Sequence, residues 1–439
     1  MNWHRIRQFL AETVEGPRVL RNVCLPSACV EAIALPEIGD GLVRADIGIS
    51  RGRIQLLQPV DRQDETGPAD AMVWPGTVDC HAHIDKGQVW ARTPNPDGTF
   101  QSALDAAPQD RIWFSGHEDL VRRAEFIIKS AYAHGTTAIR SHVDAAPEVF
   151  DTMFGPLKEL AQERADRMHL QLAPFTGIGT DPVWVGELAV AAKDPASGVL
   201  SLFLQMDDGL PDFLDMTIRL ADQHGLALDF HADETLDPKS NCLLEVARAV
   251  LRHGFEGPVV VGHCCAQSVH DLDTLTRTLE AVHNAGIGVV SLPMCNAYLQ
   301  DRRAARSPRQ RGVAPVKEMA ARGIPVALAS DNVRDAFHAY GDMDLPELLR
   351  DAMRFLQLDH PVKDWPAAVT RTPANLMGLS DHGRLRTGGP ADLILFPARN
   401  WSEFAARPQS DRIVLRKGKM IDTTPPDFAE LDVLEGMRP

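Results

Sequence analysis

The sequence predicts an α/β fold, a (β/α)8 TIM barrel accompanied by a small β-sandwich domain that both termini form. The barrel prediction depends on eight short apolar runs that alternate with amphipathic, helix-like stretches. The runs are almost continuously apolar, which is typical of parallel strands buried on both faces. The flanking segments contain short strand-like runs separated by Gly and Pro, which favours a separate β domain. An open doubly wound sheet is the alternative, but no glycine-rich dinucleotide turn follows the first run.

The eight apolar runs divide the chain into units. The stretches between them, such as 118–135 and 211–225, place apolar residues at helical spacing and end on glycine, a common helix stop. We expect residues 1–71 and 381–439 to form the β-sandwich domain and residues 72–380 to form the barrel. The runs lie at residues 72–83, 136–144, 168–175, 199–205, 226–234, 257–265, 286–293 and 324–332.

Composition excludes several classes of partner. With 24% charged and 44% hydrophobic residues, the chain is typical of a soluble globular protein, and its net charge of -15 opposes binding to nucleic acid or anionic lipid. No apolar leader and no run of about eighteen apolar residues occurs, so we expect a cytoplasmic protein without a membrane span. The seven cysteines are scattered, and we expect them to be mostly reduced and buried.

Polar residues of catalytic type fall at the carboxyl ends of the runs, where a (β/α)8 barrel carries its reactive groups. His81 and His83 close the first run, and residues i and i+2 of a strand point to the same side, so both rings can reach one ion. The remaining residues of this kind are Asp144 in the second run, His231 and Glu234 in the fifth, His263 in the sixth and Asp331 in the eighth.

Three histidines and one aspartate from these ends predict a site for a divalent ion such as Fe²⁺ or Zn²⁺, with a position left for water. The ion would lower the pKa of that water and form hydroxide near neutral pH. Asp331 is then expected to accept the remaining proton, and Glu234, three residues after His231, to move a proton between water and substrate. The alternative for Glu234 is a cap on the next helix.

His263 has two interpretations. In most proteins such a histidine is a hydrogen-bonded core residue, but its place at the end of the sixth run favours a role beside the metal site. Cys264 and Cys265 follow it and point to opposite faces of a strand, so packing is expected for at least one of them.

Several short motifs, taken together, indicate a protein family more specifically than any single residue does. "HAHIDK", "RSHVD", "DFHADE", "PMCNAYLQDRRAARSPRQRGVAPVKEM" and "SDNVRDAF" occur in the order found in the amidohydrolase superfamily, and within it the chain is similar to bacterial cytosine deaminase. The resemblance covers most of the barrel, and "GGPADLILFPA" resembles the family's C-terminal β segment.

The resemblance implies hydrolytic deamination of a small nitrogen heterocycle, in which metal-bound hydroxide attacks an amidine-like ring carbon and ammonia leaves. It also implies that Glu234 protonates the ring nitrogen, that His263 assists the hydroxide, and that the enzyme is a homo-oligomer. One ion is expected, because "VLSLFLQMDDG" lacks the lysine that bridges two metals in binuclear relatives. The implied metal ligands are His81, His83, His231 and Asp331.

Two departures from the cytosine deaminase pattern concern the substrate. Thr176-Gly177 replaces a Pro-Gln pair that ends the third strand, and Asn332 replaces a second Asp after the eighth-strand ligand. Both changes alter groups that would read a base edge. Gln205, at the end of the fourth run, is a further candidate substrate contact, or else a surface residue. Asn296, Leu299 and Gln300 match the family's N-x-x-L-Q loop, which is expected to shape the pocket, although Asn also caps turns.

The substrate therefore has several candidates. Cytosine or a related base is the first expectation, and a larger heterocycle such as a pterin or an N-alkyl aminotriazine is the second, because Thr176-Gly177 leaves space. Hydrolysis of a cyclic amide is a weaker alternative, because the bridging lysine is missing and "HADE" follows the fifth run. A barrel without catalytic activity is also weaker, because no expected ligand is missing.

Overall fold

The computed structural model describes residues 3–11, 17–60, 71–113 and 116–435. Eight strands form one sheet in which neighbours follow the chain order from β6 to β13. A parallel bridge between Ala82 and Asp331 joins its two ends, and the Asp331 N–H donates to the carbonyl of His81 at 2.9 Å. The predicted TIM barrel is therefore confirmed. Its strands are β6 (Thr77–Ala82), β7 (Thr136–Asp144), β8 (His169–Gly177), β9 (Val199–Phe203), β10 (Ala227–Ala232), β11 (Val259–His263), β12 (Gly288–Ser291) and β13 (Val326–Leu328).

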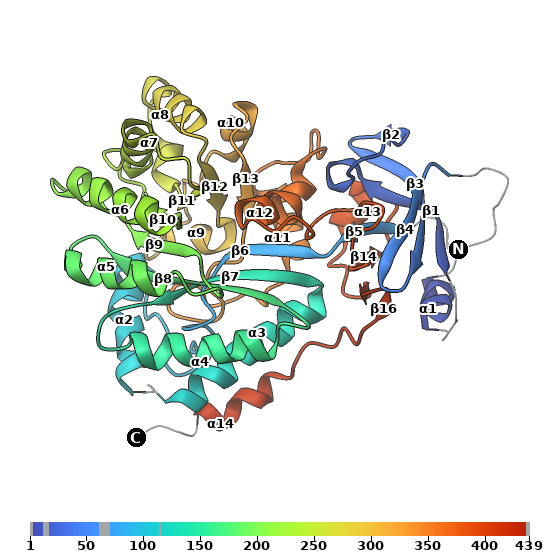
Figure 1. The fold of residues 1–439 in the computed structure, drawn as a ribbon, viewed down its shortest axis with the longest axis horizontal. Coiled ribbons are helices and arrows are strands. Elements are labelled where there is room, and N and C mark those ends of the chain that lie inside the picture. Colours follow the sequence, from blue (N-terminus) through green and yellow to red (C-terminus); the bar gives the residue numbers. More distant parts are fainter. Residues whose placement is uncertain (1–2, 12–16, 61–70, 114–115, 436–439) are drawn as a thin grey trace. The chain divides into compact units, whose positions relative to one another are not determined.

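Helices alternate with these strands along the chain, and α5 to α8 lie outside them in Figure 1. Gly225 and Gly254 end α6 and α7 with φ angles of 66° and 59°, a left-handed conformation that favours glycine, as the helix-stop pattern predicts. The helices are α2 (Phe100–Trp113), α3 (His117–His134), α4 (Phe150–Glu163), α5 (Pro182–Ala191), α6 (Leu210–His224), α7 (Cys242–His253), α8 (Leu272–Asn284), α9 (Pro293–Leu299) and α10 (Val316–Ala321).

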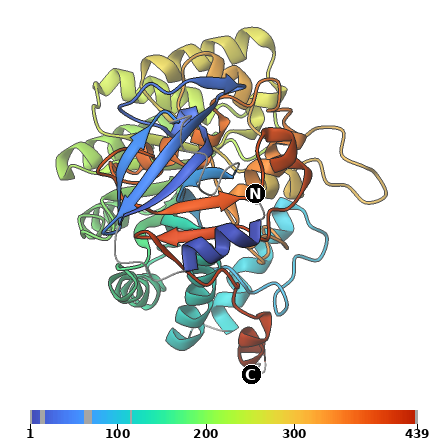
Figure 2. The same ribbon diagram turned by 90° about the vertical axis from the view of Figure 1, so that its right-hand side faces the viewer.

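A second, mixed sheet takes its strands from both ends of the chain. Its order is β16-β15-β14-β5-β1-β3-β2, with β4 paired to β3, and Figure 2 shows the blue N-terminal strands beside the red C-terminal ones. One hydrophobic cluster with fully buried Leu20, Ile47 and Leu415 fills its core. The strands are β1 (Arg18–Pro26), β2 (Glu37–Gly39), β3 (Leu42–Ser50), β4 (Arg53–Gln58), β5 (Met72–Pro75), β14 (Leu393–Phe396), β15 (Ile413–Arg416) and β16 (Lys419–Met420).

The chain divides into two compact units. One comprises residues 1–79, 129–138 and 344–425, and contains the mixed sheet with α1 (Trp3–Ala11), α11 (Leu345–Phe355), α12 (Arg371–Leu376) and α13 (Trp401–Ala406). The other comprises residues 80–128, 139–343 and 426–439, which include α14 (Asp432–Glu435) and every candidate site residue. The domain limits expected after residues 71 and 380 stay a prediction.

The first apolar run is two strands, where the sequence suggested one. Residues 72–75 form β5, which pairs with β14 and β1 of the mixed sheet, and the barrel strand β6 begins at Thr77. Pro75 cannot donate to a strand ladder, so the run breaks there. At Gly76 a Cβ atom would lie 2.3 Å from the Thr137 side chain, so a larger residue does not fit this link.

All seven cysteines are buried, as expected, and each is free in the structure. Within the described part of the chain, no helix is both long and apolar enough to cross a membrane.

Candidate active site

The four expected metal ligands lie together at the carboxyl ends of the barrel strands. His81 belongs to β6, His83 follows it, His231 belongs to β10, and Asp331 follows β13. Asp331 Oδ1 lies 3.6 Å from His81 Nε2 and 3.3 Å from His83 Nε2, and His83 Nε2 lies 3.3 Å from His231 Nε2. The closing bridge of the barrel brings Asp331 beside the histidines of β6.

Two overlapping groups of described residues that contain the expected histidine ligands could hold a divalent ion: His81, His83 and Asp331 form one, and His231 falls with His81, His142 and Asp229 in the other. Tetrahedral zinc with Zn–N bonds of about 2.0–2.1 Å holds its ligand atoms roughly 3.3–3.4 Å apart. All four expected ligands are at most 4% exposed, so their ligand atoms are largely shielded from bulk solvent. The donor set of three imidazoles and a carboxylate suits zinc or ferrous iron equally well.

The pKa shifts of the four residues also favour metal binding. Burial, assisted by nearby cationic groups, lowers the pKa of His81, His83 and His231 well below the usual histidine value, so their rings are neutral and their lone pairs available. Burial raises the pKa of Asp331 to about 6, an effect that the charge on His263 partly opposes. A divalent ion would supply the positive charge that this carboxylate lacks.

Glu234 and His263 form a second group beside Asp331. His263 Nδ1 lies 3.3 Å from Glu234 Oε1, and the amide of Asn296 lies 3.0 Å from His263 Nδ1 and donates to Glu234 Oε1 at 3.3 Å. Burial opposes protonation of His263, but the charges of Glu234 and Asp331 outweigh it and raise the pKa of this histidine. The N-x-x-L-Q loop also holds Glu234 through a bond from Gln300 Nε2 to the Glu234 carbonyl at 3.1 Å.

The structure separates the two interpretations of Glu234. Its neighbour Asp233 occupies the N-terminus of α7, where it accepts hydrogen bonds from the backbone N–H groups of Cys242 at 2.8 Å and Leu243 at 3.0 Å. Glu234 is therefore not needed as a cap, and its side chain lines the pocket.

Several strand ends carry backbone strain. His263 and Asp331 have φ angles of 70° and 63°, and Asp233 and Cys264 have 57° and 53°. Non-glycine residues rarely adopt this left-handed region, and it occurs where a site requires a particular side-chain direction.

Cys264 and Cys265 are buried, and burial raises the pKa of both thiols. Both side chains therefore act as core packing residues.

A pocket of about 310 Å³ opens above these groups. The polar end is formed by His83, His231, Glu234, His263 and Asp331, and the walls include aromatic side chains. Other lining residues are Phe100, Phe175, Phe203, Phe337, Thr176, Gly177, Asn332, Lys86 and Asp144.

The expected substrate residues differ in their positions. Thr176 and Asn332 line the pocket, although the Asn332 amide already donates to Asp335 at 2.7 Å and Thr176 shares a hydrogen bond with Thr180 at 2.8 Å. Asn296 is fully buried behind Glu234. Gln205 follows the end of β9 at Phe203, and it is exposed and is not among the residues that line the pocket.

Sequence reasoning assigned no role to Lys86, which lines the pocket. Its Nζ lies 3.2 Å from Asp144 Oδ1 and 5.5 Å from the ring centres of both Phe175 and Phe337. Lys86 stands in the "HAHIDK" motif, three residues after His83, and that proximity to an expected ligand was the available signal.

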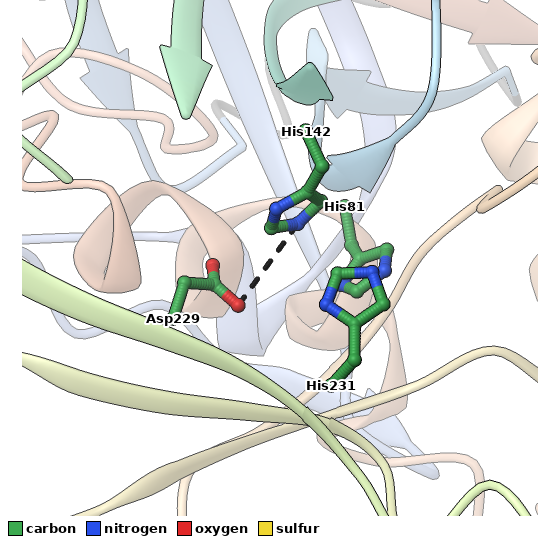
Figure 3. Close-up of side chains that lie close together, drawn as sticks. All are labelled: His81, His142, Asp229 and His231. Carbon is green, nitrogen blue, oxygen red and sulfur yellow. Dashed lines mark ion pairs between the residues drawn. The ribbon is translucent and has the colours of Figure 1, made fainter. Parts of the chain in front are cut away.

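A buried polar layer next to the histidines was also missed. It contains Arg140, His142 and Asp229, and Figure 3 shows His142 and Asp229 beside His81 and His231. The available signal was a spacing of two residues, which places side chains on the same face of a strand. Arg140 and His142 have this spacing on β7, and Asp229 and His231 have it on β10.

Comparison with known proteins agrees with the fold and with the expected family. A model of the amidohydrolase family matches residues 159–421. A pterin deaminase of Rhizobium rhizogenes (strain K84) is 44% identical over 95% of this chain and 97% of its own length. An N-isopropylammelide isopropyl amidohydrolase of Pseudomonas sp. (strain ADP) is 21% identical over 86% and 93%. The structure of 5-methylcytosine deaminase from Klebsiella pneumoniae with 5-fluorocytosine shares the fold, with a TM-score of 0.78, 24% identity and coverage of 92% and 97%.

The barrel fold and the family match together define a hydrolase that acts on C–N bonds. The chain belongs to the amidohydrolase family. Similarity to cytosine deaminases, expected from the motifs, is confirmed by the shared fold.

Proposed function

We propose that the protein is a hydrolytic deaminase of a pterin, a two-ring heterocycle with an amino group on an amidine-like carbon. The observation that carries this proposal is the 44% identity to a pterin deaminase, which extends over 95% of the chain. It favours the larger heterocycle, the second expectation from the sequence, over cytosine.

The residues that line the pocket support a flat heterocyclic substrate. Its volume of about 310 Å³ is at the lower end of the roughly 300–1,000 Å³ typical of ligand pockets. Thr176-Gly177 adds little bulk to the wall, and Phe175 and Phe203 offer apolar surface to a flat ring. Lys86 and Asp144 supply polar contacts for ring nitrogens, a ring carbonyl or a substituent.

The proposed ligands of one divalent ion are His81, His83, His231 and Asp331. A zinc or ferrous ion held there would supply a Lewis acid that activates water for attack near neutral pH. The protein itself keeps the histidines neutral by burial, so that they offer lone pairs.

Glu234 and His263 would handle the protons. In the overall reaction the water oxygen bonds to the ring carbon, the C–N bond breaks, and the two water protons end on a ring nitrogen and on the departing ammonia. Glu234 lines the pocket and is held by Asn296 and Gln300, so its carboxylate is positioned to carry a proton to the ring nitrogen. His263, 3.3 Å from Glu234, presents Nε2 without a partner among the described residues and is suited to orient the attacking water.

The test measures release of ammonia from pterin and cytosine, and release of an alkylamine from an N-alkyl aminotriazine, by zinc- or iron-loaded protein. We expect pterin to react fastest and Glu234→Gln to lower kcat by about 100- to 10,000-fold, the usual range for a lost proton-transfer group. Glu280→Gln, at an exposed position on α8, is the matched control and should retain activity.

Faster release from cytosine than from pterin would contradict the substrate proposal and keep the deaminase chemistry. A new carboxylate without ammonia would instead indicate ring opening and contradict both.

Gly177→Gln tests the role of the small residues in the pocket wall. A Cβ at position 177 lies 3.7 Å from Phe203 Cβ, so the backbone tolerates a side chain there. The added side chain would occupy pocket space, and we expect the ratio of kcat/KM for pterin to that for cytosine to fall about 10- to 200-fold. An unchanged ratio would show that this wall does not select the substrate.

An N-alkyl aminotriazine is the second candidate substrate, because the relative from Pseudomonas bears the name of an enzyme that acts on such a compound. With this substrate the released product would be an alkylamine, which an ammonia assay alone does not detect.

A further inference from the structure

Next to the candidate ligands, the barrel interior contains an ion pair that the deaminase chemistry does not use. Arg140 on β7 donates from Nη1 to Asp229 Oδ2 on β10 at 2.8 Å, and both residues are at most 1% exposed. Arg140 Nε also donates to Gln171 Oε1 on β8 at 2.8 Å. Three strands are thereby connected by charged and polar side chains in the interior of the sheet.

His142 packs against all three histidines of the proposed metal site. Its ring centre lies 4.2 Å from that of His81, 4.5 Å from that of His231 and 5.4 Å from that of His83. Figure 3 shows His142 beside His81 and His231, with Asp229 on its other side.

Two contacts determine the orientation of the His142 ring. Nδ1 shares a hydrogen bond of 2.7 Å with Ser201 Oγ on β9, and Nε2 faces Asp229 Oδ1 at 3.9 Å. Neither Nε2 nor Asp229 Oδ1 has a hydrogen-bond partner among the described residues. The ring therefore has one firm anchor and one electrostatic contact, and it meets His81 at a tilted angle of 52° and His231 nearly at a right angle, 84°.

We propose that His142 is a positioning residue, anchored by Ser201 and flanked by the Arg140–Asp229 pair, which holds the rings of His81 and His231 in the orientation that binds the metal ion. Without this ring the two imidazoles would face a cavity and gain rotamer freedom, which metal binding would then have to remove. Outer groups that orient ligand histidines are commonly worth about 10- to 100-fold in metal affinity. The inference rests on the proposed metal site and not on the identity of the heterocycle.

The test is zinc affinity, measured by competition with a chromogenic chelator on metal-stripped protein, with no substrate present. Ser201→Ala removes the anchor and leaves the ring, and we expect zinc affinity to fall several-fold. The matched control is Ser291→Ala on β12, because Ser291 is equally buried and its Oγ has no partner among the described residues. Its affinity should equal that of the wild type.

His142→Asn is the stronger variant. Asparagine keeps a polar atom near the position of Nδ1 for Ser201 but removes the ring, so we expect a loss of zinc affinity of about 10- to 100-fold. Circular dichroism and the unfolding midpoint of the metal-free protein show whether each variant is folded; if His142→Asn does not fold, Ser201→Ala still tests the proposal. A residue with a merely structural role would lower the midpoint and leave zinc affinity unchanged.

Three results would overturn the inference. Folded Ser201→Ala with wild-type zinc affinity would show that the anchor does not matter. Two zinc ions per wild-type chain and one in His142→Asn would make His142 a ligand, not a positioning residue. Wild-type protein that binds no zinc would overturn the metal site itself, and the positioning role with it, whereas a failure to act on pterin would leave both intact.

Discussion

Two aspartates, one in each compact unit, are buried to a similar degree and have opposite electrostatics. The side chain of Asp344 is 8% exposed and that of Asp331 is 1% exposed. Asp344 binds both terminal nitrogens of Arg412, with Nη1 to Oδ1 at 2.6 Å, and lies 3.6 Å from His134. Burial alone would raise the pKa of Asp344, but these two neighbours outweigh it and the pKa falls below its usual value. The pKa of Asp331 rises to about 6.

The difference teaches how a structural carboxylate is distinguished from a candidate ligand. Asp344 receives its countercharge from the chain and in addition caps α11, accepting from the Glu347 N–H at 3.2 Å. Asp331 faces imidazoles that burial keeps neutral, so the chain supplies little of the positive charge it needs. A carboxylate left in this state at the end of a barrel strand is suited to receive an external cation.

The largest expected effect comes from Arg412→Met, which leaves Asp344 charged and without its main partner. Removal of one member of a buried ion pair usually costs about 3–5 kcal/mol of unfolding free energy. Urea denaturation at pH 7 measures the loss, and zinc affinity should not change. An unfolding free energy within about 1 kcal/mol of wild type would be on the order of a surface substitution. It would contradict the structural role of Asp344.

Asp331→Asn should have the reverse outcome. We expect zinc affinity to fall by more than about 100-fold, because a direct ligand is worth more than an outer contact. The unfolding free energy of the metal-free protein should not decrease, since the substitution removes a buried charge that lacks compensation. Chelator competition and urea denaturation on the same samples measure both quantities. A large loss of stability with unchanged zinc affinity would show that Asp331, like Asp344, has a structural role and does not bind the ion.

Asp335 allows a smaller, pH-dependent test of the same idea. It accepts only neutral donors, from Asn332 at 2.7 Å and from the backbone of Phe337 at 2.9 Å and His338 at 3.0 Å, and burial raises its pKa to about 7. A carboxyl group whose pKa is higher in the folded than in the unfolded protein stabilises the fold at low pH. That contribution disappears as pH rises from about 4 to about 7.

The wild-type protein should therefore lose unfolding free energy between pH 5 and pH 8. Asp335→Asn should lose less over the same range, by about 1–3 kcal/mol. The exposed Asp222→Asn on α6 is the control and should keep the wild-type pH dependence. An identical pH profile for Asp335→Asn would mean that Asp335 is compensated by its three donors alone.

Much of the fold could be predicted because local patterns carry it. Apolar runs of strand length, helical spacing between them and glycine at helix ends predicted all eight barrel strands. The same patterns did not reveal the break at Pro75 and Gly76, because whether a strand continues depends on which sheet receives it, and that is a long-range property. Gln205 illustrates a related limit: its position at a strand end left open whether its side chain reaches the pocket or solvent, and only the structure shows that it is exposed.

The sequence by itself determined the chemistry available to this protein, since residue type and strand-end position place three imidazoles, an aspartate and a glutamate at one end of a barrel. Tertiary structure decided which of two neighbouring residues has a structural role and which lines the pocket. Asp233 and Glu234 are adjacent carboxylates, and the approach of the α7 N-terminus takes one as a cap and leaves the other to the pocket. Arg140 and His142 read as ordinary polar residues of β7, and they are buried because Asp229, Ser201 and Gln171 meet them from other strands. Burial and electrostatic pairing arise from contacts between segments far apart in the chain, so no local pattern can encode them.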